Sequence, residues 1–123
     1  MMSRSENWSH EFVELAENGR VGSELVSETE RVRVWHIHSK PGDRLKVHTH
    51  VLDYFWTVHS SGKARNYLSD GTYVDVEYVP GDTKHFTFAE GERMTHSIEN
   101  IGLTDLIFTT VEFKDSANMP LKL

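Results

Sequence analysis

The stretch Gly42-Asp43-Arg44-Leu45-Lys46-Val47-His48-Thr49-His50 ends in two histidines separated by a single residue. Side chains alternate between the two faces of a β-strand, so His48 and His50 on a strand would face the same side. A third histidine, His96, lies much further along the chain. An imidazole from a distant strand would complete the three-point grip that an open catalytic metal site needs. The three histidines therefore predict a metal site, although they do not identify a substrate.

Short β-like runs separated by turn signals fill the chain from about residue 30. Pairs such as Pro41-Gly42, Asp70-Gly71 and Pro80-Gly81 recur at intervals of roughly 8–12 residues, as in sandwiches and barrels. No long helical pattern interrupts them, which indicates an antiparallel all-β fold. The predicted strands are 32–38, 45–50, 54–59, 64–68, 73–79, 84–88, 95–98 and 106–113.

The segment before these runs has a different pattern. We expect a loose tail up to about residue 8 and then a short helix. Ser9 would cap this helix, Phe12, Leu15 and Ala16 would lie on one side, and Asn18-Gly19 would end it. The predicted organisation is a tail and helix over residues 1–28, followed by a barrel over residues 29–123.

Composition restricts the partners and the compartment. With 123 residues and a net charge of −6, the chain predicts one domain without the basic face that nucleic acids or anionic membranes require. There is no cysteine, which excludes thiolate ligands and disulfides. No signal-peptide pattern and no membrane-length apolar run is present, so we expect a cytoplasmic protein that binds a small molecule.

The spacing of glycines and histidines resembles the cupin (RmlC-like) family. Its first motif is Gly-x5-His-x-His-x3-4-Glu-x6-Gly, which Gly42, His48, His50 and Gly62 fit. Its second motif ends in His-x3-Asn, as His96-x3-Asn100 does, and the resemblance covers about residues 30–113. The run from His48 to Tyr54 looks most similar to small cupins that include a β-alanine-degradation protein. The resemblance implies a double-stranded β-helix (jelly-roll barrel), a divalent metal held by His48, His50 and His96, and a homodimer.

Two departures from the family pattern bear on the chemistry. The glutamate of the first motif would fall at Tyr54 or Phe55, and residues 89–93 lack the Pro-x-Gly of the second motif. Some family members work with three histidines and no glutamate, including dioxygenases. Three neutral ligands leave the charge of a metal uncompensated, which favours an anionic substrate or hydroxide.

Several further residues are candidates for the site. Asp53 could be a ligand, orient a ligand imidazole, or cap the turn after His50. Tyr54, His59 and His85 are candidates for catalytic proton transfer, although each could equally be an ordinary core or surface residue.

Arginine and asparagine side chains add two expectations. Arg65 and Arg93 are candidate anchors for a substrate carboxylate, because a guanidinium matches a carboxylate bidentately, although each could equally be a solvated surface residue. Asn100 is expected to brace the turn after His96 through bonds to the backbone. His36 and His38 form a second His-x-His pair away from the ligand positions of the family.

The sequence favours a small metal-dependent enzyme. We expect an Fe(II) dioxygenase-type oxidoreductase that acts on a small carboxylate or carbonyl compound, with Zn, Ni, Mn and Cu as alternative metals. Two other classes stay open: a non-redox metal-dependent lyase or isomerase, and a non-catalytic ligand-binding cupin.

Overall fold

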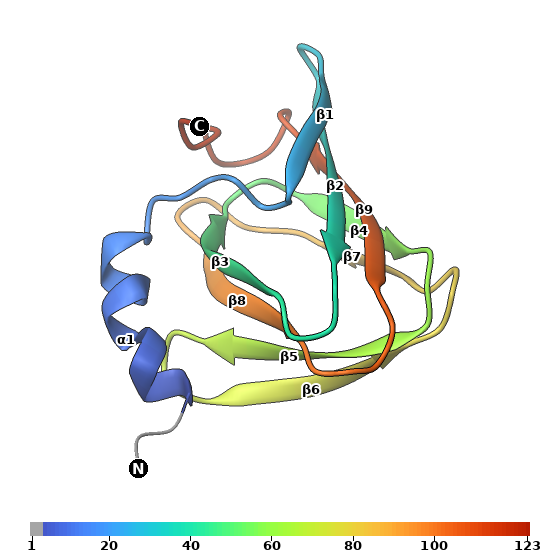
Figure 1. Ribbon diagram of the computed structural model, residues 1–123. Helices are drawn as coiled ribbons and strands as arrows, with labels where there is room; N and C mark the ends of the chain where they lie inside the picture. Colours follow the sequence, from blue (N-terminus) through green and yellow to red (C-terminus); the bar gives the residue numbers. More distant parts are fainter. Residues whose placement is uncertain (1–3) are drawn as a thin grey trace.

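Two antiparallel β-sheets curve around a common interior in the computed structural model, which describes the backbone of residues 4–123 and side chains from Trp8 onwards (Figure 1). One sheet has the strand order β1-β2-β9-β4-β7 and the other β3-β8-β5-β6. This arrangement confirms the predicted all-β double-stranded β-helix. The elements are α1 (Arg4–Glu14), β1 (Glu24–Glu28), β2 (Val32–Ser39), β3 (Arg44–His50), β4 (Tyr54–Val58), β5 (Gly62–Leu68), β6 (Tyr73–Tyr78), β7 (Thr83–Phe86), β8 (Met94–Asn100) and β9 (Leu106–Phe113).

All eight predicted strands are present, and most of their ends shift by one or two residues. The sequence did not predict β1, which pairs with β2 at the edge of its sheet, with Glu24 opposite His36 and Glu28 opposite Arg33. Nearly every β1 side chain is exposed, so the strand lacks the apolar alternation that reveals half-buried strands. Its pairing with β2 forms it instead.

The start of the chain differs from the prediction. Helix α1 already begins at Arg4, so Ser9 lies inside the helix and does not cap it. A capping preference is local and weak, and residues before Ser9 can extend the helix when the helix packs on a sheet. Residues 1–3 of the predicted tail lie outside the described residues.

Helix α1 packs on the outer face of the sheet that carries β3 and β8 (Figure 1). The Arg44 guanidinium lies 3.6 Å from the centroid of the Trp8 ring and 2.8 Å from Glu11 Oε2. It also donates a hydrogen bond of 2.7 Å to Ser97 Oγ on β8. Arg44 thus links the helix to both strands that carry the histidines.

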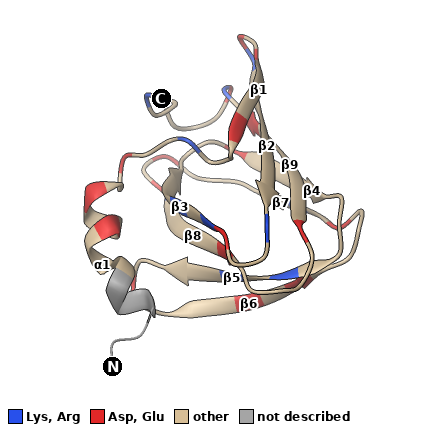
Figure 2. Cartoon of the chain, viewed as in Figure 1, with Lys and Arg blue, Asp and Glu red and all other residues tan. Residues whose placement is uncertain are grey.

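Charged residues are distributed unevenly over the elements. Asp and Glu occur on α1 and β1, whereas Lys and Arg are scattered over the strands (Figure 2).

The segment after α1 bonds directly to β3. Thr49 Oγ1 donates to Ala16 O at 2.6 Å, and the backbone N–H of Thr49 donates to Asn18 O at 2.8 Å. Asn18 Nδ2 donates in turn to Val47 O at 2.9 Å. These bonds fix β3 from outside, while its histidines face inward.

Among the described residues, α1 is too short and too polar for a membrane span, and there is no other α-helix.

A buried carboxyl lies in the core of the five-stranded sheet. Trp35 is fully buried, and its Nε1–H donates a hydrogen bond of 2.7 Å to Glu112 Oε1. Burial raises the pKa of Glu112 to about 7. The hydrogen bond from Trp35 favours the charged form and lowers the pKa, but its effect is smaller. The folded protein therefore holds a proton on Glu112 that the unfolded chain releases near its ordinary pKa of 4.5. Glu112 thus reduces stability as the pH rises through this interval.

Replacing Glu112 by Gln should remove this pH dependence, because the amide keeps an acceptor for Trp35 and cannot ionise. We compare the free energy of unfolding of Glu112→Gln with that of the wild type. Their difference should shift in favour of the variant by about 2 kcal/mol from pH 5 to pH 8. Urea unfolding at the two pH values measures it. Glu90→Gln, at an exposed position, is the control for a lost surface charge. Parallel pH profiles for wild type and Glu112→Gln would contradict the expectation.

Candidate metal centre

Adjacent strands bring the three histidines together. In the β3–β8 pairing His48 lies directly opposite His96, and His50 lies two residues further along β3. Between Leu45 and His48 the register shifts, because β3 has one more residue than β8 there, which is a β-bulge. The bulge places Leu45, His48 and His50 all on the inner face, where they line one cavity.

The bulge also determines which nitrogen of His48 is free. His48 Nδ1 lies 2.8 Å from Lys46 O, and a carbonyl can only accept, so Nδ1 carries the proton. His48 Nε2 is buried and has no hydrogen-bond partner among the described residues. Its lone pair is therefore available to a ligand inside the barrel.

Asn66 on β5 orients His96 in the same way. His96 Nδ1 lies 3.1 Å from Asn66 Oδ1. Asn66 also forms a hydrogen bond with the Tyr78 hydroxyl. This bond lowers the pKa of Tyr78, although burial has the larger effect and raises it. The amide thus donates to Tyr78 and accepts the proton of His96 Nδ1. His96 Nε2 is left to face His50 Nε2 at 3.1 Å.

Burial keeps all three imidazoles neutral. It lowers the pKa of His48 to about 4, and it lowers the pKa values of His50 and His96 well below their ordinary value. The neighbouring imidazoles lower those of His50 and His96 further. At neutral pH each ring therefore keeps a lone pair, as a metal ligand must.

The spacing of the ligand nitrogens fits a metal ion. One nitrogen from each of the three histidines lies within 4.8 Å of the others, and in the described part of the chain no second group of this kind occurs. Bonds of about 2.1 Å at right angles would place two nitrogens about 3 Å apart. The distance between His50 Nε2 and His96 Nε2, 3.1 Å, matches this value. The buried free nitrogen of His48 completes the three-His metal-binding cluster.

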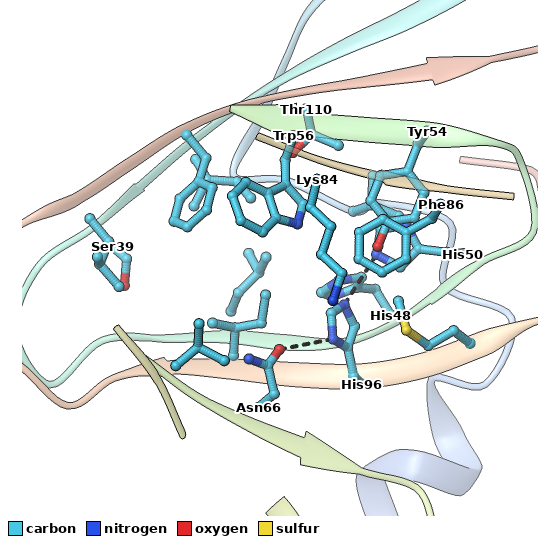
Figure 3. A pocket seen from close by; sticks show the side chains of 18 of the residues that line it. Ser39, His48, His50, Tyr54, Trp56, Asn66, Lys84, Phe86, His96 and Thr110 are labelled. Carbon is cyan, nitrogen blue, oxygen red and sulfur yellow. Dashed lines mark hydrogen bonds between the residues drawn. The ribbon is translucent and has the colours of Figure 1, made fainter. Parts of the chain in front are cut away.

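Tyr54 occupies the position where the family pattern has glutamate. Its ring stacks on His50, with centroids 4.1 Å apart, and on Phe86, with centroids 4.5 Å apart. Its hydroxyl points into the cavity toward the histidines (Figure 3). Burial, followed by the charge of Glu112, raises the pKa of Tyr54 well above its ordinary value. Tyr54 is thus a protonated hydrogen-bond donor at neutral pH.

The histidines line a cavity of about 300 Å³ between the sheets. Its walls are mainly aliphatic and aromatic, and no Asp or Glu among residues 8–123 lines it. The polar side chains in its lining are Ser39, His48, His50, Tyr54, Trp56, Asn66, Tyr78, Lys84, His96 and Thr110 (Figure 3). A volume of this size lies at the lower end of the range for small-molecule sites.

The structure places two predicted proton-transfer residues outside the cavity lining. His59 follows β4, and its Nε2 lies 2.8 Å from Thr109 Oγ1 at an exposed position. His85 is exposed on β7, with its ring 5.3 Å from that of Phe55. Strand alternation explains this placement, because Tyr54 and Phe86 face inward and the two histidines lie an odd number of residues away. Of the three candidates, only Tyr54 reaches the cavity.

The two predicted arginine anchors also lie elsewhere. Arg65 forms a bidentate pair with Asp75, with distances of 2.7 and 3.0 Å, and lies over the Tyr73 ring. Arg93 pairs with Glu17 at 2.9 Å, between the chain after α1 and the start of β8. Neither lines the cavity, so both guanidinium groups stabilise the barrel from outside.

Asp53 and Asn100 brace loops. Asp53 Oδ1 accepts a hydrogen bond of 2.9 Å from the backbone N–H of Phe88, which makes Asp53 a turn residue and not a member of the histidine cluster. Asn100 Nδ2 donates to Ser39 O and Thr104 O, as expected for a residue that braces the turn after β8.

Asn66 and Lys84 are cavity residues that the sequence reasoning missed. Alternation carried a signal for both. Asn66 lies between Ala64 and Leu68 at the same parity, and Lys84 shares the parity of the inward aromatic Phe86. A polar residue in such an apolar series is worth testing as a site residue.

Comparison with solved structures places the fold among cupins. The chain is similar to a cupin domain from Bordetella pertussis Tohama I, with 23% identity over 74% of this chain and 90% of that chain and a TM-score of 0.65. It is also similar to an uncharacterized conserved protein with a double-stranded β-helix domain from Klebsiella pneumoniae subsp. pneumoniae MGH 78578, with 27% identity over 77% of each chain and a TM-score of 0.59. The architecture is thus the cupin double-stranded β-helix.

A third similarity covers part of a much longer protein. The chain matches a variant of oxalate decarboxylase from Bacillus subtilis with 29% identity over 67% of this chain and 21% of that chain, with a TM-score of 0.50. No protein-family model and no curated protein matches the sequence. The predicted resemblance to the β-alanine-degradation group and the predicted homodimer stay predictions.

Asn66 should set the metal affinity through His96. Asn66→Leu removes the acceptor that holds the proton on Nδ1, so we expect metal affinity to fall about 10- to 100-fold. Asn66→Asp keeps an acceptor and should retain tight binding. Competition titrations with Zn(II) or Co(II) measure both, with circular dichroism to verify folding. Equal affinities for Asn66→Leu and the wild type would show that the bond to Asn66 does not orient a ligand.

Proposed function

We propose that this protein is a metal-dependent cupin enzyme, an Fe(II) oxygenase acting on a small carboxylate or carbonyl compound. One observation carries the proposal. Three neutral imidazoles bring their ring nitrogens within 4.8 Å of one another at a cavity that, among the described side chains, no carboxylate lines. His48, His50 and His96 would hold the metal and leave its other positions open for substrate.

The chain would supply binding and proton control around this centre. A divalent metal there would act as a strong Lewis acid and, as Fe(II), as a source of electrons for O2 chemistry. The Tyr54 hydroxyl, protonated and directed at the cluster, would donate a hydrogen bond or a proton to an oxygen of the reacting molecule. Aliphatic and aromatic walls such as Ile98 and Phe108 would exclude water from the reaction.

Size and similarity support a small oxygen-bearing substrate. A cavity of about 300 Å³ has room for about ten water molecules. The similarity to an oxalate decarboxylase supports a carboxylate substrate and keeps a non-redox decarboxylation as the second candidate. Both reactions would use the same three histidines. Consumption of O2 is the observation that separates them.

The metal and the O2 chemistry are testable together. We expect the wild type, loaded anaerobically with Fe(II), to bind about one equivalent and to consume O2 with some member of a panel of small 2-oxo acids, 2-hydroxy acids and diketones. His96→Ala should lose both properties, because two imidazoles hold the metal too weakly.

His38→Ala is the matched control, since His38 pairs with Asp105 at an exposed position outside the cluster. An oxygen electrode and elemental analysis give the readouts. Turnover with Zn or Ni but not with Fe and O2 would reject the redox assignment in favour of a lyase or isomerase. Substoichiometric metal that His96→Ala leaves unchanged would favour a ligand-binding cupin.

Tyr54→Phe tests the proton donor and keeps the stacked ring. Because the hydroxyl makes no hydrogen bond that stabilises the fold among the described residues, the variant should fold and bind metal normally. We expect kcat to fall about 100-fold, as is typical for the loss of a positioned acid. Steady-state kinetics at equal metal content measures it. An unchanged kcat would reduce Tyr54 to a packing role.

A further inference from the structure

Lys84 is a charged side chain inside an otherwise uncharged cavity. It lies on β7, the edge strand of the five-stranded sheet, opposite Trp56 on β4. Alternation places it on the same face as Phe86, and its Nζ lies 5.1 Å from the centroid of the Phe86 ring. Of the described residues that line the cavity, it is the sole Lys, Arg, Asp or Glu.

Lys84 differs from the other well-placed cations of the barrel in having no anionic partner. Arg33, Arg44, Arg65, Arg93 and Lys114 each form an ion pair with a carboxylate. Within residues 8–123, no hydrogen bond or ion pair engages the Lys84 amino group. Its side chain extends into the cavity toward the side where the histidines lie (Figure 3). The amino group is thus free to bind a ligand.

The charges around the cavity call for an anion. The three imidazoles are neutral and no acidic side chain that the structure describes lines the cavity, so the charges of a bound divalent metal and of Lys84 would both be uncompensated. Lys84 is solvent-exposed on the edge strand β7, and its amino group lies beside the Phe86 ring. An anionic ligand that enters from this side would meet the ammonium group first.

Away from a metal at the histidines, the lining offers a ligand one charged contact, which is Lys84. Apart from the histidines and Lys84, the walls consist largely of aliphatic and aromatic side chains, including Val76, Ile98, Leu106 and Phe108. A second carboxylate or a phosphate would find no second cation on these walls. An apolar body of moderate size would instead be buried against them.

We propose that Lys84 is a substrate-binding residue that holds the carboxylate of a small monocarboxylic acid with an apolar body. A second oxygen of the acid would face the histidine cluster, and the whole molecule would have about ten non-hydrogen atoms. This inference rests on the proposed function for the role of the metal. The contact between Lys84 and the carboxylate does not need the metal, which makes the two separable by experiment.

The test uses 4-methyl-2-oxopentanoate as the probe, which combines one carboxylate, one keto oxygen and a branched apolar chain. Its affinity is measured by isothermal titration calorimetry on the full chain, both metal-free and loaded with Zn(II). Lys84→Met keeps the length of the stem and removes the charge. We expect it to weaken binding about 10- to 100-fold in both forms, the range for a lost charged hydrogen bond. Lys84→Arg should restore most of the affinity.

Two controls isolate the charge contact. Lys63→Met removes an exposed lysine on β5 that does not line the cavity, and it should leave the affinity unchanged. The neutral ketone 4-methyl-2-pentanone should bind the wild type and Lys84→Met equally, because it lacks the carboxylate.

The outcomes distinguish this inference from the proposed function. If Zn(II) binds through the histidines but Lys84→Met does not weaken binding of the acid, or the wild type binds no acid, the inference on Lys84 is wrong and the metal site stands. If the protein binds no metal but the acid still depends on Lys84, the inference holds and the metal-dependent function fails. Equal weakening by Lys63→Met would reduce the effect to net charge and overturn the inference.

Discussion

The pairing of β3 with β8, including its one-residue bulge, is the constraint on which the site depends. It places His48 directly opposite His96 and turns Lys46 O toward His48 Nδ1. Without the bulge, simple alternation would put Lys46 on the inner face together with the two histidines. With it, Lys46 is exposed and Leu45 lines the cavity instead. A local irregularity in one strand therefore sets both the lining and the tautomer of a ligand.

Burial and hydrogen bonding then make the imidazoles suitable ligands. Burial is the main reason that they stay uncharged, and the acceptors Lys46 O and Asn66 Oδ1 place the protons of His48 and His96 on Nδ1. The ring nitrogens of the three buried histidines meet inside the barrel, where burial lowers the effective dielectric constant and strengthens charge interactions. Outside, Arg44 and the segment after α1 hold the same two strands in place. Among the described residues of the lining, Lys84 is the one Lys or Arg.

Side-chain parity separates the candidate residues that line the cavity from those that do not. His48 and His50 are two residues apart and share a face, as predicted. Tyr54 and His59 are an odd number of residues apart on one extended run, so both could not face the cavity. The same argument sends His85 outward and Lys84 inward. Arg65 and Arg93 were chosen for their chemistry, but the barrel uses them in ion pairs with Asp75 and Glu17.

The sequence by itself determined the strands β2 to β9, the turns, the all-β class and the three histidines, because local periodicity and spacing indicate each of them. It could not predict β1, whose exposed side chains carry no apolar pattern, or the start of α1, which packing on the sheet extends beyond the expected cap. Only the tertiary structure decided that Asn66 orients His96, that Tyr54 stacks on His50, and that Lys84 enters the cavity without a partner. Each of these contacts depends on strands that are distant in sequence lying side by side. A bulge or a one-residue change in register would turn these side chains to the other face of the sheet.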